Sequence, residues 1–310
     1  DERIFGSSNW DQQGRSHDVA LLRYDGVLKI DVGAAFNQNQ RHLNGAYYNL
    51  NNYKMMQFVW LNTDIVDNLN LSLLFLNNGY QYDYRLFENG TNHSMTKNIF
   101  NQTFGGRMML TPGDFNFHAS AYYTMGKDTK DRDLSAFYVG LGLDYELADN
   151  WDLGIGWEHL SGTDQKDMIE NPDTYKNKSF NPFYGSSHKF NGFMDYFNAN
   201  DNWSNSVGLN DLFASVQFSK RKFEVNLTGH AFLTAASVIK NGNVNETMEP
   251  YLGTELDLTM AYKLSKNSNV VLGYSQMFGS ETLETLKGGN KDAFNNYAYL
   301  MFTFKPVFLK

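Results

Sequence analysis

The sequence predicts an all-β protein, a transmembrane antiparallel up-and-down β-barrel, because long stretches of it alternate apolar and polar residues. The clearest example is residues 134–162, where two alternating segments flank a turn at 148–150. Segments of about ten residues are long enough for a tilted strand to cross a bilayer. Tyrosine and tryptophan lie toward the ends of this hairpin, as they do at a membrane interface. Such a hairpin is the repeating unit of an outer-membrane barrel.

The composition agrees with this fold and argues against several other classes. Aromatic residues make up 15% of the 310 residues, no residue is cysteine, and mean hydropathy is −0.49. No run approaches 18 apolar residues, so a membrane-spanning helix is not expected. Barrel strands expose only alternate side chains to lipid, which leaves the averaged hydropathy low. The net charge of −8 argues against nucleic acid as a partner.

The first half of the chain contains six predicted strands, joined in pairs by short turns. Asp25-Gly26 is a strong two-residue hairpin signal, and Pro112-Gly113-Asp114 also favours a turn. After the first turn, alternate residues from Leu28 to Phe36 are apolar, which predicts one lipid-facing and one lumen-facing side. The predicted strands are 17–24, 27–36, 54–66, 69–77, 98–111 and 115–126.

The second half contains seven further strands with the same alternation. They are 134–147, 151–162, 206–218, 223–234, 251–264, 269–278 and 297–304. Short turns alternate with long polar loops, at 37–53, 78–97 and 163–205. This asymmetry is typical of Gram-negative outer-membrane barrels, whose short turns are periplasmic and whose long loops are extracellular. It places the C-terminus in the periplasm.

The predicted strand count is odd, whereas single-chain bacterial barrels have an even number. An open sheet in lipid would leave costly unpaired backbone groups. Two explanations are open: residues 1–16 supply a strand, which gives fourteen, or further strands precede this sequence. Residues 1–310 are expected to form a single barrel domain in either case.

The loop 163–205 is too long for a simple connection and too aromatic for a disordered one. We expect it to fold into or over the barrel as a constriction or cap. The alternative is that its aromatic side chains only pack the loop onto the wall. The candidate constriction residues are Phe183, Tyr184, His188, Lys189, Asn191 and Asp195.

The alternation also assigns charged side chains to the lumen, where they would line a pore. Four are basic and eight are acidic, so an anion would meet an unfavourable mean field. The alternative is a cross-strand network of charges that stiffens the wall. The candidate lining residues, with two histidines, are Lys29, Asp31, Arg107, His118, Asp144, Glu146, Asp152, Glu158, Lys222, Glu224, His230, Glu255, Asp257 and Lys263.

Two stretches carry a resemblance to a known family. SFNPFYGSSHKFNGFMDYF (179–197) and DERIFGSSNWDQQGRSHDVALLRYD (1–25) resemble segments of the bacterial alginate-export-like outer-membrane barrels, in a Bacteroidota-type member. The resemblance implies a monomeric barrel of up to eighteen strands, with five strands before Asp1. It also implies an arginine-lined, positive conduit for a polyuronate. The predicted acidic lining departs from that pattern, which puts alginate as the substrate in doubt.

These observations predict an outer-membrane channel or porin for diffusion or export of hydrophilic solutes, with oligo- or polysaccharides as candidates. The alternative is a loop-plugged structural or accessory barrel subunit of a larger outer-membrane complex. No catalytic motif such as HExxH or GxSxG is present, so we expect no enzyme, no metal site and no cofactor. The expected partners are membrane lipid and lipopolysaccharide, a hydrophilic solute and, in the alternative, partner subunits.

Overall fold

The computed structural model describes residues 2–11, 14–37, 53–88, 91–197 and 206–307. This part of the chain forms one antiparallel sheet of thirteen strands in sequence order, as predicted. The first seven strands are β1 (Ala20–Asp25), β2 (Leu28–Phe36), β3 (Met55–Val66), β4 (Leu69–Glu88), β5 (Thr91–Leu110), β6 (Phe115–Lys127) and β7 (Asp133–Ala148). The others are β8 (Trp151–Leu160), β9 (Leu209–Lys220), β10 (Phe223–Leu233), β13 (Tyr251–Ser265), β14 (Ser268–Gly279) and β15 (Asn295–Phe304).

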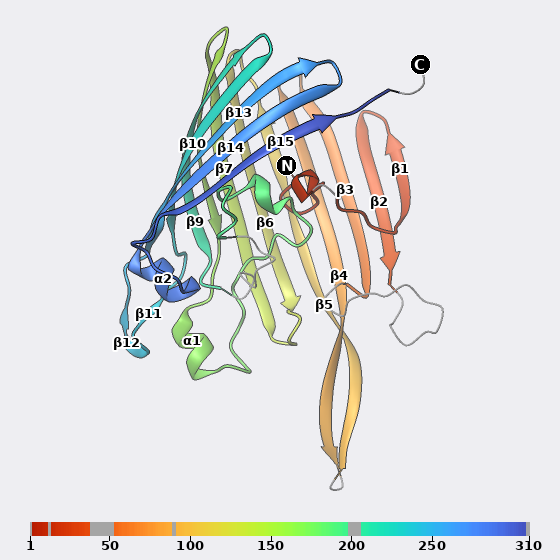
Figure 1. The fold of residues 1–310 in the computed structure, drawn as a ribbon. Helices are drawn as coiled ribbons and strands as arrows, with labels where there is room; N and C mark the ends of the chain where they lie inside the picture. The colour runs from red at the N-terminus through yellow and green to blue at the C-terminus, as the bar shows by residue number, and fades with distance from the viewer. Residues whose placement is uncertain (1, 12–13, 38–52, 89–90, 198–205, 308–310) are drawn as a thin grey trace.

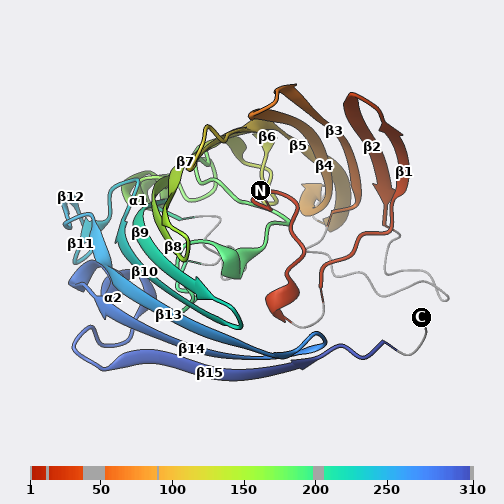
Figure 2. The same ribbon diagram turned by 90° about the horizontal axis from the view of Figure 1, so that it is seen from above.

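The sheet is strongly curved, and the chain's N-terminal segment lies inside the curve (Figure 2). Side chains alternate between a concave and a convex face in every long strand. On β7, Ala136 is fully buried, whereas its neighbour Phe137 is 44% exposed. On β2, Val32 is 41% exposed and Ala35 is buried. The convex face is therefore apolar and exposed, as a lipid-facing barrel wall requires.

β4 and β5 are longer than the sequence predicts, and the predicted loop at 78–97 is wrong. Each strand has 20 residues, and their hairpin projects beyond the rest of the sheet (Figure 1). Their residues remain paired in register to the end of the hairpin. Tyr82 stacks on Tyr84 at 6.2 Å between ring centroids, and Lys97 lies over both rings. Tyrosines alternate with polar residues at positions 80–85, so the aliphatic alternation of the other strands is missing there.

The segment before β1 is not a strand, so it does not supply the fourteenth strand considered above. It contains a 3₁₀ helix, η1 (Asn9–Asp11), and a single parallel β-bridge from Phe5 to Tyr184. This segment lies inside the curved sheet rather than extending its edge (Figure 2).

The remaining elements lie in the connections between strands. The connection after β8 contains α1 (Gln165–Glu170) and the 3₁₀ helix η2 (Ser187–Lys189). The connection after β10 contains the small hairpin β11 (Ile239–Lys240) and β12 (Asn243–Thr247), and α2 (Glu281–Lys287) follows β14. Of these elements, α1, α2 and the β11–β12 hairpin gather at one end of the sheet (Figure 1). None of the described helices is long and apolar enough to cross a membrane.

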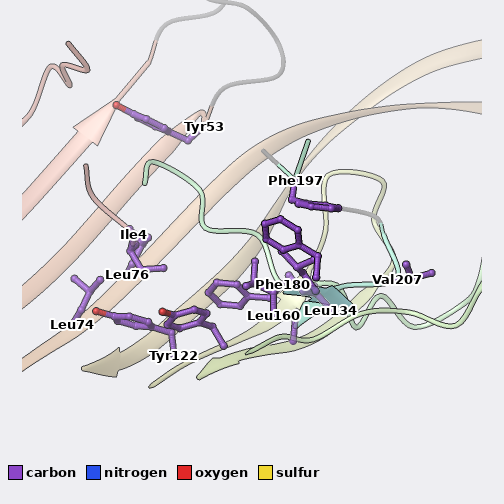
Figure 3. Packing of buried hydrophobic residues seen from close by; sticks show 14 of the residues in the cluster. Ile4, Tyr53, Leu74, Leu76, Tyr122, Leu134, Leu160, Phe180, Phe197 and Val207 are labelled. Carbon is purple, nitrogen blue, oxygen red and sulfur yellow. The ribbon is translucent and has the colours of Figure 1, made fainter. Parts of the chain in front are cut away.

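The hydrophobic core lies on the concave side of the sheet, where strand residues meet the inserted segments (Figure 3). Ile4 comes from the N-terminal segment, and Phe180 and Phe197 come from the connection after β8. They pack with buried strand residues, among them Tyr138, Leu160, Leu209 and Phe232. These side chains would be exposed to water in an open lumen. Since they are buried, protein fills this part of the lumen.

Candidate functional site

Two segments distant in sequence fill the lumen together; we call residues 2–11 and 177–197 the lumen insert. Their backbones pair directly, since Gly6 N–H donates to the Tyr184 carbonyl at 2.8 Å and Tyr184 N–H donates to the Ile4 carbonyl at 3.1 Å. Ser186 N–H also donates to the Glu2 carbonyl at 2.9 Å. The two segments therefore form one unit inside the sheet.

A buried ion pair links the insert to the wall, between Arg3 and Glu158 on β8. Arg3 is 2% exposed, and its guanidinium lies 3.7 Å from the Phe190 ring centroid. Tyr138 donates a 2.7 Å hydrogen bond to the other Glu158 oxygen. Burial alone would lower the pKa of Arg3, but the Glu158 carboxylate outweighs it and the pKa lies above the ordinary value. Arg3 is thus a fixed cation inside the lumen.

Asn191 connects the insert to two acidic wall residues. Its amide nitrogen donates to Glu158 at 2.9 Å and to Asp211 on β9 at 3.2 Å. Its amide oxygen accepts from Arg3 at 3.3 Å. Asn191 adopts a positive φ of 61°, a conformation that asparagine tolerates better than most residues. The side chain can therefore contact both carboxylates from a tight turn.

Two further wall carboxylates accept backbone hydrogen bonds from the insert. Phe193 N–H donates to Asp257 at 3.1 Å, and Met194 N–H donates to Glu255 at 2.8 Å, both acceptors being on β13. The second oxygens, Glu255 Oε2 and Asp257 Oδ1, are buried without a hydrogen-bond partner among the described residues. Buried carboxylates are costly unless paired, so these two side chains depend on the insert for the hydrogen bonds that they accept.

His230 on β10 contacts two of the three wall carboxylates Asp211, Glu255 and Asp257, which we call the acidic cluster. Its Nδ1 lies 2.9 Å from Asp211 Oδ1, and its Nε2 lies 3.7 Å from Asp257 Oδ2. The ring bridges two strands through these two carboxylates. The alternation assigned Glu158, His230, Glu255 and Asp257 to the lumen, and the structure shows that they lie close together. Asp211, which was not among the predicted residues, lies beside them.

Gly192 allows the insert to approach β13 closely. It has a φ of +85°, and an added Cβ would lie 2.6 Å from Glu255 Oε1. A substitution would push away the backbone that donates to Glu255 and Asp257. The close approach therefore depends on glycine at this position.

We expect Gly192→Ala to loosen the insert, and Gly242→Ala provides a matched control. Gly242 has a φ of +75°, and an added Cβ there would meet nothing within 4 Å, so both variants carry the same strain of roughly 1–2 kcal/mol. Only Gly192→Ala adds a clash. Limited proteolysis should cleave the insert faster in Gly192→Ala alone. Equal protection of the two variants would contradict the close approach.

Tyr184 anchors the opposite side of the insert in an aromatic cluster. Its ring stacks on Phe5 at 5.6 Å and meets His17 and Tyr53 edge-on, and its hydroxyl donates to Asn78 at 2.8 Å. Burial raises the pKa of Tyr184 above its ordinary value. Burial, with the nearby Arg15 charge as a smaller cause, lowers the pKa of His17. Neutral rings therefore occupy this side.

The other predicted constriction residues lie in the insert but have different surroundings. Phe183 carries a positive φ of 50°, and its carbonyl accepts from Arg15 at 3.3 Å. His188 Nδ1 lies 2.8 Å from Asp195 Oδ2. Lys189 donates to Glu2 at 3.0 Å, and this hydrogen bond lowers the pKa of the Glu2 carboxyl. His188 and Lys189 therefore lie beside the N-terminal segment, not beside the acidic cluster.

A second acidic region lies at the short-turn end of the lumen. A cavity of about 530 Å³ is lined there by Asp114, Asp144, Glu146 and Asp152, together with apolar and neutral polar residues. None of its lining residues is lysine or arginine. His118 Nε2 lies 4.0 Å from the carboxylate of Asp144, which lines this cavity. The charged groups in the lining of this cavity are therefore all carboxylates.

Of the predicted basic lining residues, Lys222 and Lys263 are neighbours, since Lys263 N–H donates to the Lys222 carbonyl at 2.9 Å, whereas Lys29 and Arg107 lie on β2 and β5. Arg107 Nε is buried on β5 without a hydrogen-bond partner among the described residues. Asp31 pairs with Arg23 across β1 and β2 at 2.8 Å, which supports the cross-strand alternative at this position. The remaining predicted residues, at exposed positions near the short turns, are Lys29, Lys222, Glu224 and Lys263.

Sequence reasoning missed three residues that organise the lumen. Asp211 lies on the concave side of β9, and the alternation Asp211, Phe213, Ser215, Gln217 would have revealed it. Arg3 and Trp10 precede the first strand, where no periodicity exists.

Among the described residues, no group of three or more His, Cys, Asp or Glu side chains is arranged to hold a metal ion.

Comparison of the fold with solved structures identifies outer-membrane proteins of similar architecture. The chain is similar to the outer membrane protein OprD from Pseudomonas aeruginosa, with 11% identity, a TM-score of 0.54, and coverage of 97% of this chain and 72% of that one. It is also similar to Pseudomonas aeruginosa OccK5 (OpdH), with 12% identity, a TM-score of 0.54, and coverage of 90% and 70%. At these identities the likeness shows the fold alone.

The comparison with protein families gives the identity of the chain. A search of curated protein sequences finds no match. The model of the alginate export family matches residues 78–295, which is well over half of the sequence and includes β5 to β14 and most of the lumen insert. The sequence resemblance is thereby confirmed, and this protein belongs to the alginate export family of outer-membrane β-barrels.

Proposed function

We propose that this outer-membrane channel conducts small cations and uncharged hydrophilic solutes through a lumen narrowed by the insert. The observation that carries the proposal is the cavity at the short-turn end, whose charged lining residues are all acidic. Acidic rings favour cations in channels because they replace part of the hydration of the ion and repel anions. The proposal includes no catalytic step.

The acidic cluster at the insert supports the same selectivity. The charge of Arg3 compensates that of Glu158. Asp211 contacts His230, and Glu255 and Asp257 accept hydrogen bonds from backbone N–H groups of the insert. A polyuronate would carry a carboxylate on every residue past these groups. The acidic side chains of the lumen would repel the carboxylates of such a polymer, because charges interact more strongly away from bulk water. We therefore propose solutes other than a polyanion for this family member.

We expect the triple variant Asp144→Asn, Glu146→Gln, Asp152→Asn to lose cation preference, because it removes three of the four carboxylates of the cavity. The reversal potential in a salt gradient across a planar bilayer measures this change. The matched control is Glu246→Gln, Glu249→Gln, Asp292→Asn, three exposed acids outside the cavity. A control that shifts as much as the lumen variant would show that the cavity does not set selectivity.

We further propose that the short turns and the C-terminus face the periplasm, so that the long connections lie among lipopolysaccharide. The chain contains no cysteine, so single-cysteine variants report orientation without background. Gly242→Cys, in the β11–β12 turn, should react with an impermeant maleimide in intact cells. Gly113→Cys, in the β5–β6 turn, should react only after the outer membrane is permeabilised. The reverse labelling would refute this orientation.

The filled lumen also favours a second candidate function, a plugged accessory subunit of an outer-membrane complex. Its supporting observation is the extent of buried contact between the insert and the wall, including Phe180 and Phe197. In that case purified barrels would remain silent in bilayers, and a stoichiometric partner would remain bound after mild detergent extraction. Ohmic steps from the isolated protein would reject this alternative.

A further inference from the structure

A separate cavity lies between the two halves of the lumen insert. It has a volume of about 410 Å³ and is lined by residues of the N-terminal segment and of the η2 region. The lining residues are Glu2, Ser7, Ser8, Asn9, Trp10, Ser186, His188, Lys189 and Phe193. It shares no lining residue with the acidic cavity at the short-turn end.

One part of this cavity is built from stacked rings. His188 lies between Trp10, at 4.0 Å and 10° between ring planes, and Phe193, at 5.0 Å and 20°. Asp195 holds the His188 ring through Nδ1 at 2.8 Å, and Tyr299 on β15 supports Trp10 edge-on at 4.5 Å. Trp10 and His188 are thus each held by a further side chain, and the stack presents a rigid aromatic surface.

The rest of the lining is rich in hydroxyl and amide groups. Ser7, Asn9 and Ser186 contribute neutral donors and acceptors. Ser8 is buried, and its hydroxyl has no hydrogen-bond partner among the described residues. A buried hydroxyl without a partner costs stability, so a ligand hydroxyl at this place would be favoured.

The charges of the cavity are balanced. Glu2 and Lys189 form an ion pair at 3.0 Å and leave no net charge between them. Elsewhere in the lumen, carboxylates repel anions. A ligand of this cavity should therefore be uncharged, rich in hydroxyl groups, and flat enough on one apolar face to lie against aromatic rings.

We propose that this cavity is a binding subsite for one unit of an uncharged saccharide. Pyranose rings combine an apolar C–H face with hydroxyl groups at the edge, and the cavity offers both complements. The subsite deepens the proposed channel function and rests on it, because the sugar would reach the cavity through the lumen. The aromatic rings of the cavity are already held in place, so binding a sugar against them would cost little conformational entropy.

The test is a titration of the purified full-length protein in detergent with a panel of neutral hexasaccharides (maltohexaose, cellohexaose, mannohexaose and xylohexaose) and with hexaguluronate. Isothermal calorimetry reads binding whether or not the protein conducts, so failure of the channel and failure of the subsite are distinguishable. We expect at least one neutral sugar to bind, and to bind more tightly than hexaguluronate.

Trp10→Ala should weaken that binding about tenfold, the effect of one lost aromatic contact. Trp10→Phe should restore most of it, which a general loss of folding would not allow. Trp151→Ala is the control, since Trp151 lies in the outer face near a short turn. Binding unchanged by Trp10→Ala, absence of binding by every neutral sugar, or tighter binding of hexaguluronate would each overturn the proposal.

Discussion

Arg3→Met should release the lumen insert and increase single-channel conductance. Glu158 would lose its buried cationic partner while Asp211 and Glu255 remain close to the same insert. Removing one member of a buried ion pair costs about 3–5 kcal/mol, because the other charge stays buried. The cost should fall on docking of the insert, since the strands of the sheet keep their own hydrogen bonds. Conductance in planar bilayers measures the release, and proteolysis of the N-terminal segment provides an independent measure.

Arg23→Met is the control for Arg3→Met. Arg23 also pairs with an acidic residue, Asp31, but its side chain is largely exposed to water at the short-turn end. Exposed ion pairs contribute little to stability. We expect normal conductance and normal proteolysis for this variant. If Arg3→Met behaved like Arg23→Met, the insert would not depend on its buried cation.

Excision of residues 164–205 should have a still larger effect on conductance. The two ends of this connection are adjacent, since Thr163 N–H donates to the Ser206 carbonyl at 3.0 Å. An Asn-Gly linker could therefore join β8 to β9 as a tight turn without disturbing the strands. The excision removes Phe180, Asn191 and the backbone donors to Glu255 and Asp257. We expect a several-fold larger conductance and unchanged heat-modifiable migration of the folded barrel.

A matched excision tests whether loop removal as such opens the channel. Residues 240–246 form the β11–β12 turn region, which lies outside the acidic cluster and both lumen cavities. Shortening this hairpin should leave conductance unchanged. Equal conductance of the wild type and the 164–205 excision variant would mean that the insert does not restrict the pathway.

The strands of the sheet were predictable from sequence because each strand has one face toward lipid and one face toward the lumen. Lipid on one side and the lumen on the other require alternation, and exposure alternates along β7 from Asp133 to Leu141 and along β8 from Trp151 to Ile155. Strand ends were also predictable where a tight turn carries a signal such as Asp25-Gly26. The β4–β5 hairpin was underestimated because tyrosines, rather than aliphatic residues, alternate with polar residues at positions 80–85, and such a stretch is also typical of a polar loop.

The lumen insert was only partly predictable, for a different physical reason. Aromatic content indicated that the loop 163–205 packs against another part of the chain, and Asn191 and His188, two of the candidate constriction residues, lie in the lumen insert. Its partner, the segment around Arg3, has no regular structure and therefore no periodicity. The contact between Arg3 and Glu158 spans 155 positions in the sequence. Only the three-dimensional structure shows that the two segments meet.

Cation selectivity of the channel is tested most directly by the reversal potential of the purified full-length protein in a planar bilayer with a salt gradient. The acidic cavity and the acidic cluster predict ohmic steps with a reversal potential on the cation side. A reversal potential on the anion side would contradict the lumen described here and would favour a polyuronate conduit.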